Sequence, residues 1–202
     1  MDINKVEVRN LSITDYDELK DSMIEAYSQW PGAHWQEEHI KKLLTIFPEG
    51  QIAVTIDNIL VGCALSIIVN YSHFGDSHTY AQITGNSTFN THNAKGDVLY
   101  GIELFIKPDY RGLRLGRRLY DARKELCERL NLKAITFGGR IPNYHVHANT
   151  LSPKDYIQKV RYRELFDPTL TFQISNDFHV KKVLKNYLPG DSESCDYAVL
   201  LQ

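Results

Sequence analysis

Cysteine is scarce in this sequence of 202 residues, and its pattern excludes several protein classes. The three cysteines, Cys63, Cys127 and Cys195, are an odd number without a CxxC spacing, which argues against a disulfide framework or a thiolate metal site. Cys63 lies in an apolar run and Cys127 in a helical pattern, so buried, reduced thiols are expected. The residues after Met1 form no apolar leader, and the sequence therefore predicts a soluble, cytoplasmic protein.

Long hydrophobic runs and an excess of positive charge are also missing. The longest nearly apolar stretch, 59–69, is too short to span a bilayer, so no membrane association is expected. The formal net charge is −2, whereas nucleic-acid-binding domains usually carry a basic excess. Basic residues do gather within 107–133, and a basic helix for nucleic acid stays open as a minor alternative. A solvated helix face with i,i+4 ion pairs is the other interpretation of Arg123, Lys124 and Arg129.

Strand and helix patterns alternate along the chain without a linker or an internal repeat, which predicts one α/β domain over 1–202. Residues 70–97 form a long polar insertion or loop with a short apolar patch near 80–83. Asp57-Asn58 is expected to be a tight hairpin turn, and Thr14 is expected to cap the first helix. The expected strands are 6–11, 52–56, 59–69, 98–106, 134–137, 180–188 and 197–201, and the expected helices are 14–26, 36–47, 115–130, one from Ser152, and 167–176.

The segment Tyr110-Arg111-Gly112-Leu113-Arg114-Leu115-Gly116-Arg117 carries the strongest functional signal. It lies between the apolar strand 98–106 and an amphipathic helix that starts near Leu115. Loop amides and the first N–H groups of a helix converge on one point, where the helix dipole adds positive potential. The segment therefore predicts a phosphate site. It lacks the Gly-Lys-Ser/Thr ending of an NTPase loop and the ribose-binding acid of a dinucleotide site.

The element order and the segment Arg111-Gly112-Leu113-Arg114-Leu115-Gly116 resemble the GNAT superfamily of acyl-CoA-dependent N-acyltransferases and its Gln/Arg-x-x-Gly-x-Gly/Ala signature. Residues 97–144 and 166–188 are most similar to the GNAT module that some bacterial proteins fuse to a carbon–nitrogen hydrolase of the nitrilase type. The resemblance implies a mixed, mostly antiparallel central sheet of about seven strands flanked by helices. Arg114 replaces a signature glycine, and we expect it to adopt an ordinary helical or extended conformation.

The resemblance also implies acetyl-CoA as co-substrate and direct attack of an amine on its thioester. The signature loop and the end of the preceding strand would bind the cofactor, the strand through its main chain. The implied cofactor-binding residues are Phe105, Ile106, Lys107, Arg111, Gly112, Leu113, Arg114, Leu115, Gly116 and Arg117.

Glu103 is the best candidate for the base that takes the amine proton, because it is a carboxylate within an otherwise apolar strand. The alternative is that Glu103 points to a polar face or pairs with an arginine. Many family members have a tyrosine as proton donor to the departing thiolate. The resemblance places Gln173 at that position here, and glutamine cannot act as an acid. Tyr144 or Tyr187 could serve instead, and Tyr144 is the candidate we adopt.

Trp30, Arg140 and Tyr144 are the candidate contacts to the acceptor, although Trp30 and Trp35 are also suited to packing against the sheet. His145 and His147 have no third ligand at a characteristic spacing, so no metal is expected. The sequence thus predicts an N-acetyltransferase for a small-molecule or peptide amine, with a homodimer as an open alternative for its assembly. A catalytically silent acyl-CoA-binding regulatory module, part of a nitrilase-fused protein, is the alternative function.

Overall fold

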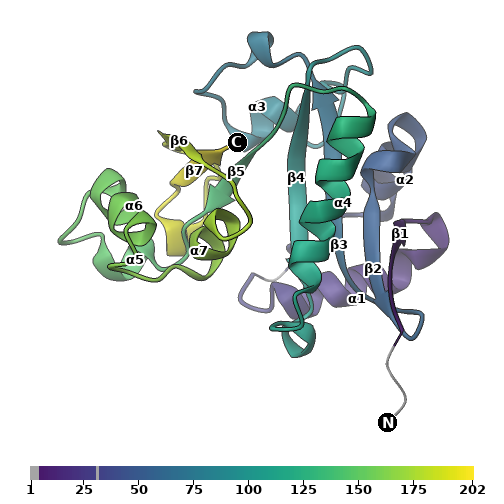
Figure 1. Cartoon of the computed structure of the whole chain (residues 1–202), viewed down its shortest axis with the longest axis horizontal. Coiled ribbons are helices and arrows are strands. Elements are labelled where there is room, and N and C mark those ends of the chain that lie inside the picture. Colours follow the sequence, from purple (N-terminus) through teal and green to yellow (C-terminus); the bar gives the residue numbers. More distant parts are fainter. Residues whose placement is uncertain (1–4, 31) are drawn as a thin grey trace. The chain divides into compact units, whose positions relative to one another are not determined.

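The structure, a computed structural model, describes residues 5–30 and 32–202 and consists of two compact units. The first contains the chain up to Val69 together with Thr88–Ile135, and the second contains Asn70–Ser87 together with Thr136–Gln202. Both units combine strands and helices (Figure 1), which confirms the expected α/β class.

An antiparallel sheet forms the centre of the first unit. Its strands pair in chain order: β1 (Val6–Asn10), β2 (Ile52–Ile56), β3 (Ile59–Val69) and β4 (Val98–Ile106). Asp57 and Asn58, which join β2 to β3, both have positive φ, 51° and 69°. Two such residues in a two-residue loop match the right-handed twist of the strands, so the expected tight hairpin is confirmed.

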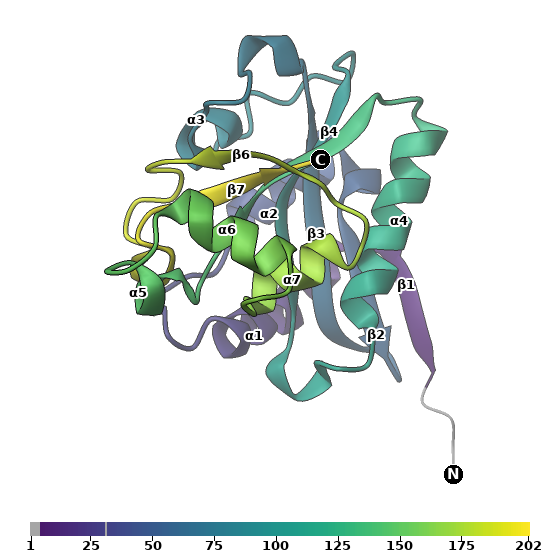
Figure 2. The same cartoon turned by 60° about the vertical axis from the view of Figure 1, so that its left-hand side comes forward.

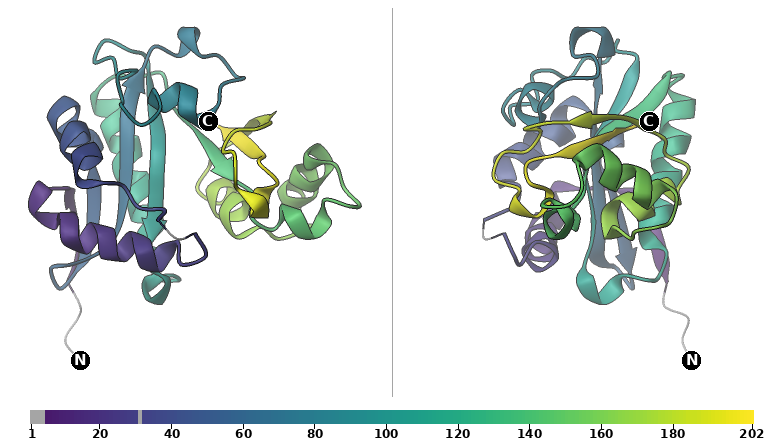
Figure 3. Two further views of the ribbon diagram at one scale, coloured as in Figure 1. Left: turned by 180° about the vertical axis from the view of Figure 1, so that it is seen from behind. Right: turned by 90° about the vertical axis from the view of Figure 1, so that its left-hand side faces the viewer.

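Helices cover both faces of this sheet. α4 (Leu115–Arg129) lies on one face (Figure 1), and α1 (Tyr16–Ala26) and α2 (Glu37–Ile46) lie on the other, as the view from behind shows (Figure 3, left). Leu115 and Leu119 of α4 are buried in one cluster with Val54, Val61 and Ala64 of the sheet. Their spacing of four residues follows the helical period, so the amphipathic pattern of α4 produces this packing.

The pairing of β3 with β4 contains one irregularity close to the candidate base. Leu65 pairs with Glu103, but the next residue, Ser66, pairs with Gly101. Ile102 is therefore an extra residue in β4, which is a β-bulge. Bulges bend a strand and leave main-chain groups outside the regular ladder, so β4 needs other hydrogen-bond partners at this position.

The second unit contains three antiparallel strands and several short helices. β7 (Ala198–Leu201) pairs with β5 (Ala134–Arg140) on one side and with β6 (Val180–Leu184) on the other. The helices are α3 (Tyr80–Thr84), α5 (Tyr144–His147), α6 (Pro153–Arg161) and α7 (Pro168–Ile174), of which the last three lie next to one another (Figure 2). Ser152 caps α6 and Asp167 caps α7, as expected for a side-chain oxygen before a helix-starting proline.

β5 continues through Gly138 and Gly139, where the sequence predicts its end. A Cβ atom at Gly138 would lie 2.2 Å from the ring of Tyr187, and one at Gly139 would lie 2.3 Å from Oε1 of Gln173. The two glycines are needed within the strand because bulky side chains approach its backbone closely.

Other local predictions also need correction. Residues 70–97 contain the short helix α3, because Thr79 and Gln82 form a capping box. Ser12 and not Thr14 caps the start of the first helical segment. The strands expected over 180–188 and 197–201 are shorter, and α5 was not foreseen. In the residues that the structure describes, no helix is both long and apolar enough to cross a bilayer.

Candidate functional site

The signature loop lies where β4 gives way to α4. Gly112 has a φ of +83° with open space around it, and residues 111–114 are exposed. Arg118 donates the first helical bond, its amide N lying 3.3 Å from the carbonyl oxygen of Arg114. The amides of Leu115, Gly116 and Arg117 precede it at the helix N-terminus, where amide groups have no helical partner. These amides and the dipole of α4 can bind an anion.

Arg114 does not have the ordinary helical or extended conformation that we expected. Its φ of 58° and ψ of 19° are left-handed, and it directly precedes α4. The loop thus keeps the backbone shape that glycine would allow, although an L side chain at that position costs about 1 kcal/mol or more. Residues held in unfavourable conformations are common at ligand-binding loops.

The arginines around this loop differ in their surroundings. Arg111 is exposed, and its Nε lies 3.3 Å from the carbonyl oxygen of Ile106. Arg114 and Arg117 are also exposed. Lys107, at the end of β4, forms an ion pair of 3.0 Å with Glu25. The loop therefore offers exposed positive side chains around the helix N-terminus, and these suit a polyphosphate.

The three predicted cofactor contacts at the end of β4, Phe105, Ile106 and Lys107, differ in the direction of their main-chain N–H groups. The amide of Lys107 donates to the carbonyl oxygen of Val61 at 2.8 Å, so this N–H faces β3. Successive N–H groups of a strand point to opposite sides, so the Phe105 amide has the same direction as that of Lys107. The Ile106 amide points away from β3. Of the three, Ile106 has the N–H best placed to bond a thioester carbonyl.

Glu103 is half-buried, and its carboxyl group is hydrogen-bonded within the first unit. The hydroxyl of Tyr27, just after α1, donates to Oε1 at 2.5 Å, and the amide of Leu104 donates to the same atom at 3.1 Å. Burial raises the pKa of Glu103, while the hydrogen bonds from Tyr27 and Leu104, the charge of Arg123 and a hydrogen bond from Trp35 act in the opposite direction. A raised pKa makes a carboxylate a stronger base than a free one, which suits a group that takes and returns protons.

The two alternatives for Glu103 can now be compared. Glu103 is half-buried and not fully exposed, and its carboxyl group accepts a hydrogen bond from Tyr27, which no sequence motif marks. Arg123 bonds the main-chain carbonyl of Glu103. Tyr27 follows the last turn of a helix, a position without a motif, so only the folded structure identifies it.

Arg123 is not on a solvated helix face. It is 2 % exposed and is one of the largest fully buried side chains. Arg129, in contrast, is exposed and forms an ion pair of 3.2 Å with Glu49. The interpretation of a solvated face is therefore wrong for Arg123. Arg129 is exposed as that interpretation expects, but its ion-pair partner Glu49 lies outside the helix.

In the same unit, Trp30 is half-buried and Trp35 packs against Phe89 and His39, with ring centroids 5.4 Å and 5.5 Å apart. Trp35 thus packs against α2 and the segment before β4, and it also donates a hydrogen bond to Glu103. Trp30 stays a predicted acceptor contact.

The other predicted site residues belong to the second unit. Arg140 binds Asp191 through two hydrogen bonds of 2.7 Å and 2.6 Å and Glu193 through one of 2.8 Å. Burial by itself would raise the pKa of Asp191, but the bonds from Arg140 and Ser194 lower it. Arg140 is thus anchored by acidic residues of its own unit.

Tyr144 is 4 % exposed, and its hydroxyl donates to the carbonyl oxygen of Leu151 at 3.1 Å. Burial raises the pKa of this phenol. Gln173, at the position of the usual tyrosine, is also buried, and its Oε1 has no hydrogen-bond partner within the described residues. The roles of Tyr144 and Arg140 stay predictions.

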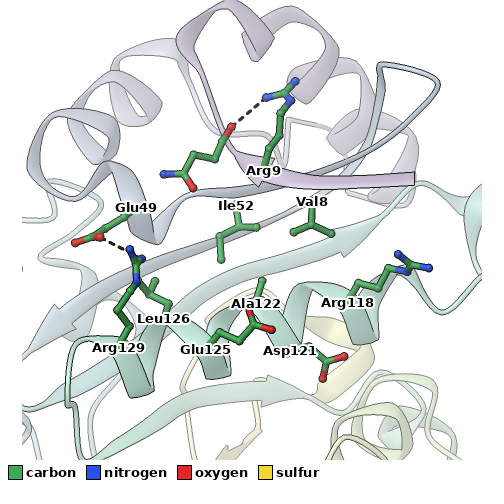
Figure 4. Close-up of a pocket in the computed structure, with 11 residues that line it drawn as sticks. Val8, Arg9, Glu49, Ile52, Arg118, Asp121, Ala122, Glu125, Leu126 and Arg129 are labelled. Carbon is green, nitrogen blue, oxygen red and sulfur yellow. Dashed lines mark hydrogen bonds and ion pairs between the residues drawn. The ribbon is translucent and has the colours of Figure 1, made fainter. Parts of the chain in front are cut away.

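A separate open groove of about 480 Å³ runs along α4 in the first unit (Figure 4). Val8, Ile52, Ala122 and Leu126 supply apolar surface, and charged groups of both signs surround them. None of the predicted site residues lines this groove. Among the described residues, no group of three or more His, Cys, Asp or Glu side chains could hold a metal ion.

Comparisons with known proteins agree with this arrangement. The model of the acetyltransferase (GNAT) family matches residues 16–149. Two curated proteins of Bacillus subtilis (strain 168) are similar to the chain. The "Probable hydrolase YhcX" is 38% identical over 98% of this chain and 38% of its own length, so this chain spans well under half of that relative. The "Uncharacterized N-acetyltransferase YkwB" is 32% identical over 83% of this chain and 74% of its own length.

Solved structures show the same fold. The loading GNATL domain of CurA from Lyngbya majuscula matches with a TM-score of 0.84, 22% identity, and coverage of 98% of this chain and 96% of that one. The GphF GNAT-like decarboxylase in complex with isobutyryl-CoA matches with a TM-score of 0.80 and 19% identity over 96% and 97% of the two chains. At these low sequence identities the similarity establishes the fold alone, and the chemistry has to be inferred from the residues of the site.

Proposed function

Because the chain belongs to the acetyltransferase (GNAT) family, we propose that it transfers an acetyl group from acetyl-CoA to a primary amine by direct attack. One observation carries the chemistry: Glu103, in the strand before the signature loop, has a half-buried carboxyl group that is bonded to Tyr27 and has a raised pKa. The amine acceptor is a small molecule or a peptide, and Trp30, Arg140 and Tyr144 are its proposed contacts.

Cofactor binding is supported by the loop at 111–116 and by the end of β4. The amides at the start of α4 would hold the pyrophosphate, and the exposed guanidinium groups of Arg111, Arg114 and Arg117 would neutralise its charge. The Ile106 amide would bond the thioester oxygen and stabilise the negative charge that develops on it during attack. One structural neighbour is described in complex with isobutyryl-CoA, which agrees with an acyl-CoA ligand for this fold.

The proposed step begins with loss of a proton from the ammonium group of the acceptor to Glu103. The nitrogen lone pair then forms a bond to the thioester carbon, and the carbon–sulfur bond breaks with its electron pair on sulfur. As the amide forms, the nitrogen loses its second proton, and the CoA thiolate takes up a proton from a donor. The second amine proton restores that donor, and Glu103 returns the first proton to water. Tyr144 is the proposed donor to the thiolate, and its hydroxyl must leave Leu151 to serve. Gln173 has no proton of suitable acidity.

The link to carbon–nitrogen hydrolases is a second part of the proposal. One relative bears the description "Probable hydrolase", and this chain covers 38% of it. We propose that a domain like this one works beside a hydrolase in such longer proteins. Retention of a separately expressed hydrolase part of that relative on the immobilised chain would support this link, and its free passage would contradict it.

The test measures CoA thiol released from acetyl-CoA across a panel of amines, with isobutyryl-CoA as a second acyl donor. Amine-dependent release by the wild-type chain, lost by a hundredfold or more in Glu103→Gln while acetyl-CoA affinity changes less than threefold, supports the proposal. Glu38→Gln, at an exposed glutamate of α2, is the matched control. Acetyl-CoA binding without release for any amine would contradict the proposal and favour the silent binding module.

A further inference from the structure

Arg123 reaches from α4 into the sheet of the first unit and ends at the bulge of β4. Its Nε donates to Oγ of Ser66 at 3.0 Å, and its Nη2 donates to the carbonyl oxygen of Leu65 at 2.6 Å. The same Nη2 also bonds the carbonyl oxygen of Glu103. One buried guanidinium group thus connects the two strands and the helix.

The acceptors of Arg123 are the residues at which the β3–β4 register shifts. Leu65 pairs with Glu103 on one side of the shift, and Ser66 pairs with Gly101 on the other. A bulge leaves carbonyl groups without regular ladder partners, and unpaired buried carbonyls are costly. The planar guanidinium group has donors in a fixed fork and can bond two carbonyls and a hydroxyl together. An ammonium group is a compact point charge without that fork, so lysine cannot replace these bonds.

The charge of Arg123 also acts on the candidate base. The guanidinium group approaches from the α4 side, whereas the Glu103 carboxyl group is bonded to Tyr27, which follows α1. The groups that act on this carboxyl group are Tyr27 beyond α1, the amide of Leu104, Arg123 of α4 and Trp35 before α2. Glu103 in turn raises the pKa of the Cys63 thiol of β3, and Tyr120 acts on Arg123. Of these groups Arg123 carries the positive charge, and it lowers the pKa of Glu103 against the effect of burial.

We propose that Arg123 is a positioning residue for acyl transfer, which fixes the bulge so that the Glu103 carboxyl group and the main chain after it keep their reactive directions. This inference rests on the proposed function, because it assigns Glu103 the role of base. α4 starts at the signature loop, and Arg123 lies about 12 Å further along its axis. The residue therefore ties the helix that bears the anion site to the strand that bears the base.

A residue with only a structural role would lower stability without changing the behaviour of Glu103, so the test needs readouts of that carboxyl group. Arg123→Lys keeps a positive charge and removes the fork, and Arg123→Gln removes the charge. Ser66→Ala removes only the hydroxyl group that accepts from Arg123. This milder variant should fold even if the two Arg123 variants do not. Arg129→Gln, at an exposed arginine of the same helix, is the control.

For each variant of the full chain, we would measure kcat and KM against pH, and the titration of the Glu103 carboxyl by NMR. In Arg123→Lys and Arg123→Gln we expect kcat to fall about ten- to a hundredfold with KM for acetyl-CoA changed less than threefold. We expect the acid limb of kcat to move to higher pH, most in the Gln variant, and Ser66→Ala to show a smaller loss. Arg129→Gln should match the wild type.

Hydrogen exchange at the amides of 101–105 is the third readout, with faster exchange expected in all three variants. Folded variants in which kcat, its pH profile and the carboxyl titration equal those of the wild type would overturn the proposal, even if their melting temperatures fall. If the wild type transfers no acetyl group to any amine, the proposed function fails by itself. The titration and the exchange then decide whether Arg123 positions Glu103, and unchanged values would overturn that as well.

Discussion

The hydroxyl group of Tyr27 lies 2.5 Å from Oε1 of Glu103, although the two residues are 76 positions apart in the chain. This contact joins the segment after α1 to the middle of β4. It holds the carboxyl group in one orientation and favours its charged form, while burial favours the neutral form. The balance between these two effects sets the pH range in which Glu103 can accept a proton.

Removing the Tyr27 hydroxyl should therefore move the pH dependence of transfer. In Tyr27→Phe the pKa of Glu103 should rise further, because a hydrogen bond to the carboxylate is lost and burial remains. We expect the acid limb of kcat/KM to move to higher pH, with a loss of about tenfold at pH 7. Steady-state rates of thiol release across a pH series measure the effect. Tyr162→Phe, at an exposed tyrosine, is the control, and an acid limb that does not move would count against Glu103 as the base.

The raised pKa of Glu103 also predicts how stability depends on pH. The folded state holds this proton more tightly than the unfolded state, whose carboxyl has a pKa near 4.5. The stability due to the protonated group is thus complete below that pH and is lost as the pH rises through the folded-state pKa. Glu103→Gln cannot lose a proton, so its advantage over the wild type should grow with pH in that window, by about 1.4 kcal/mol per unit of pKa difference.

Urea unfolding at a series of pH values measures this difference in free energy. Glu38→Gln, at an exposed position of α2, should run parallel to the wild type. A Glu103→Gln curve that also runs parallel to the wild type would show that Glu103 is not held in a desolvated site.

The left-handed Arg114 predicts an unusual response to glycine. Arg114→Gly should raise the free energy of unfolding by about 0.5 kcal/mol, because relief of the backbone outweighs the added freedom of the unfolded chain. Arg117→Gly, inside the first turn of α4, should lower it by about 1 kcal/mol. Thermal unfolding of the two variants without ligand provides the comparison. Equal losses in both would mean that Arg114 is not strained.

Gly139 and Gln173 should depend on each other. Gly139→Ala places a methyl group 2.3 Å from Oε1 of Gln173, which is too close, and we expect a loss of about 1–3 kcal/mol in the free energy of unfolding. Gln173→Ala should remove most of that loss in the double variant, because it opens the space. The four free energies form a double-mutant cycle, and additive effects would show that the two residues do not press on each other.

The sequence predicted those elements whose signals are local. The bounds of β2, β3 and β4, the hairpin at Asp57-Asn58 and the start of α4 at Leu115 follow from alternation, turn residues and helical spacing, which neighbouring residues determine. The signature loop was found for the same reason.

What the sequence did not predict depends on contacts between distant segments. Gly138 and Gly139 resemble a strand end, and only Tyr187 and Gln173 explain why glycine continues the strand there. Arg123 follows the pattern of an exposed helix face, and the bulge that it satisfies cannot be seen from α4 alone. Both features depend on contacts between different elements, so the periodicity of a single helix or strand could not reveal them.

The extra residue Ile102 has a further consequence, because it changes the parity of β4. Side chains alternate along a strand, so Gly101 and Glu103 would lie on one face if the ladder were regular. The register places Glu103 beside Leu65 and Gly101 beside Ser66, two neighbours on opposite faces of β3. Because β4 contains this one extra residue, the carboxyl group of Glu103 points toward Tyr27 and away from the face of the sheet that α4 covers. A single deletion here would invert the second half of β4 without changing the identity of any residue in it.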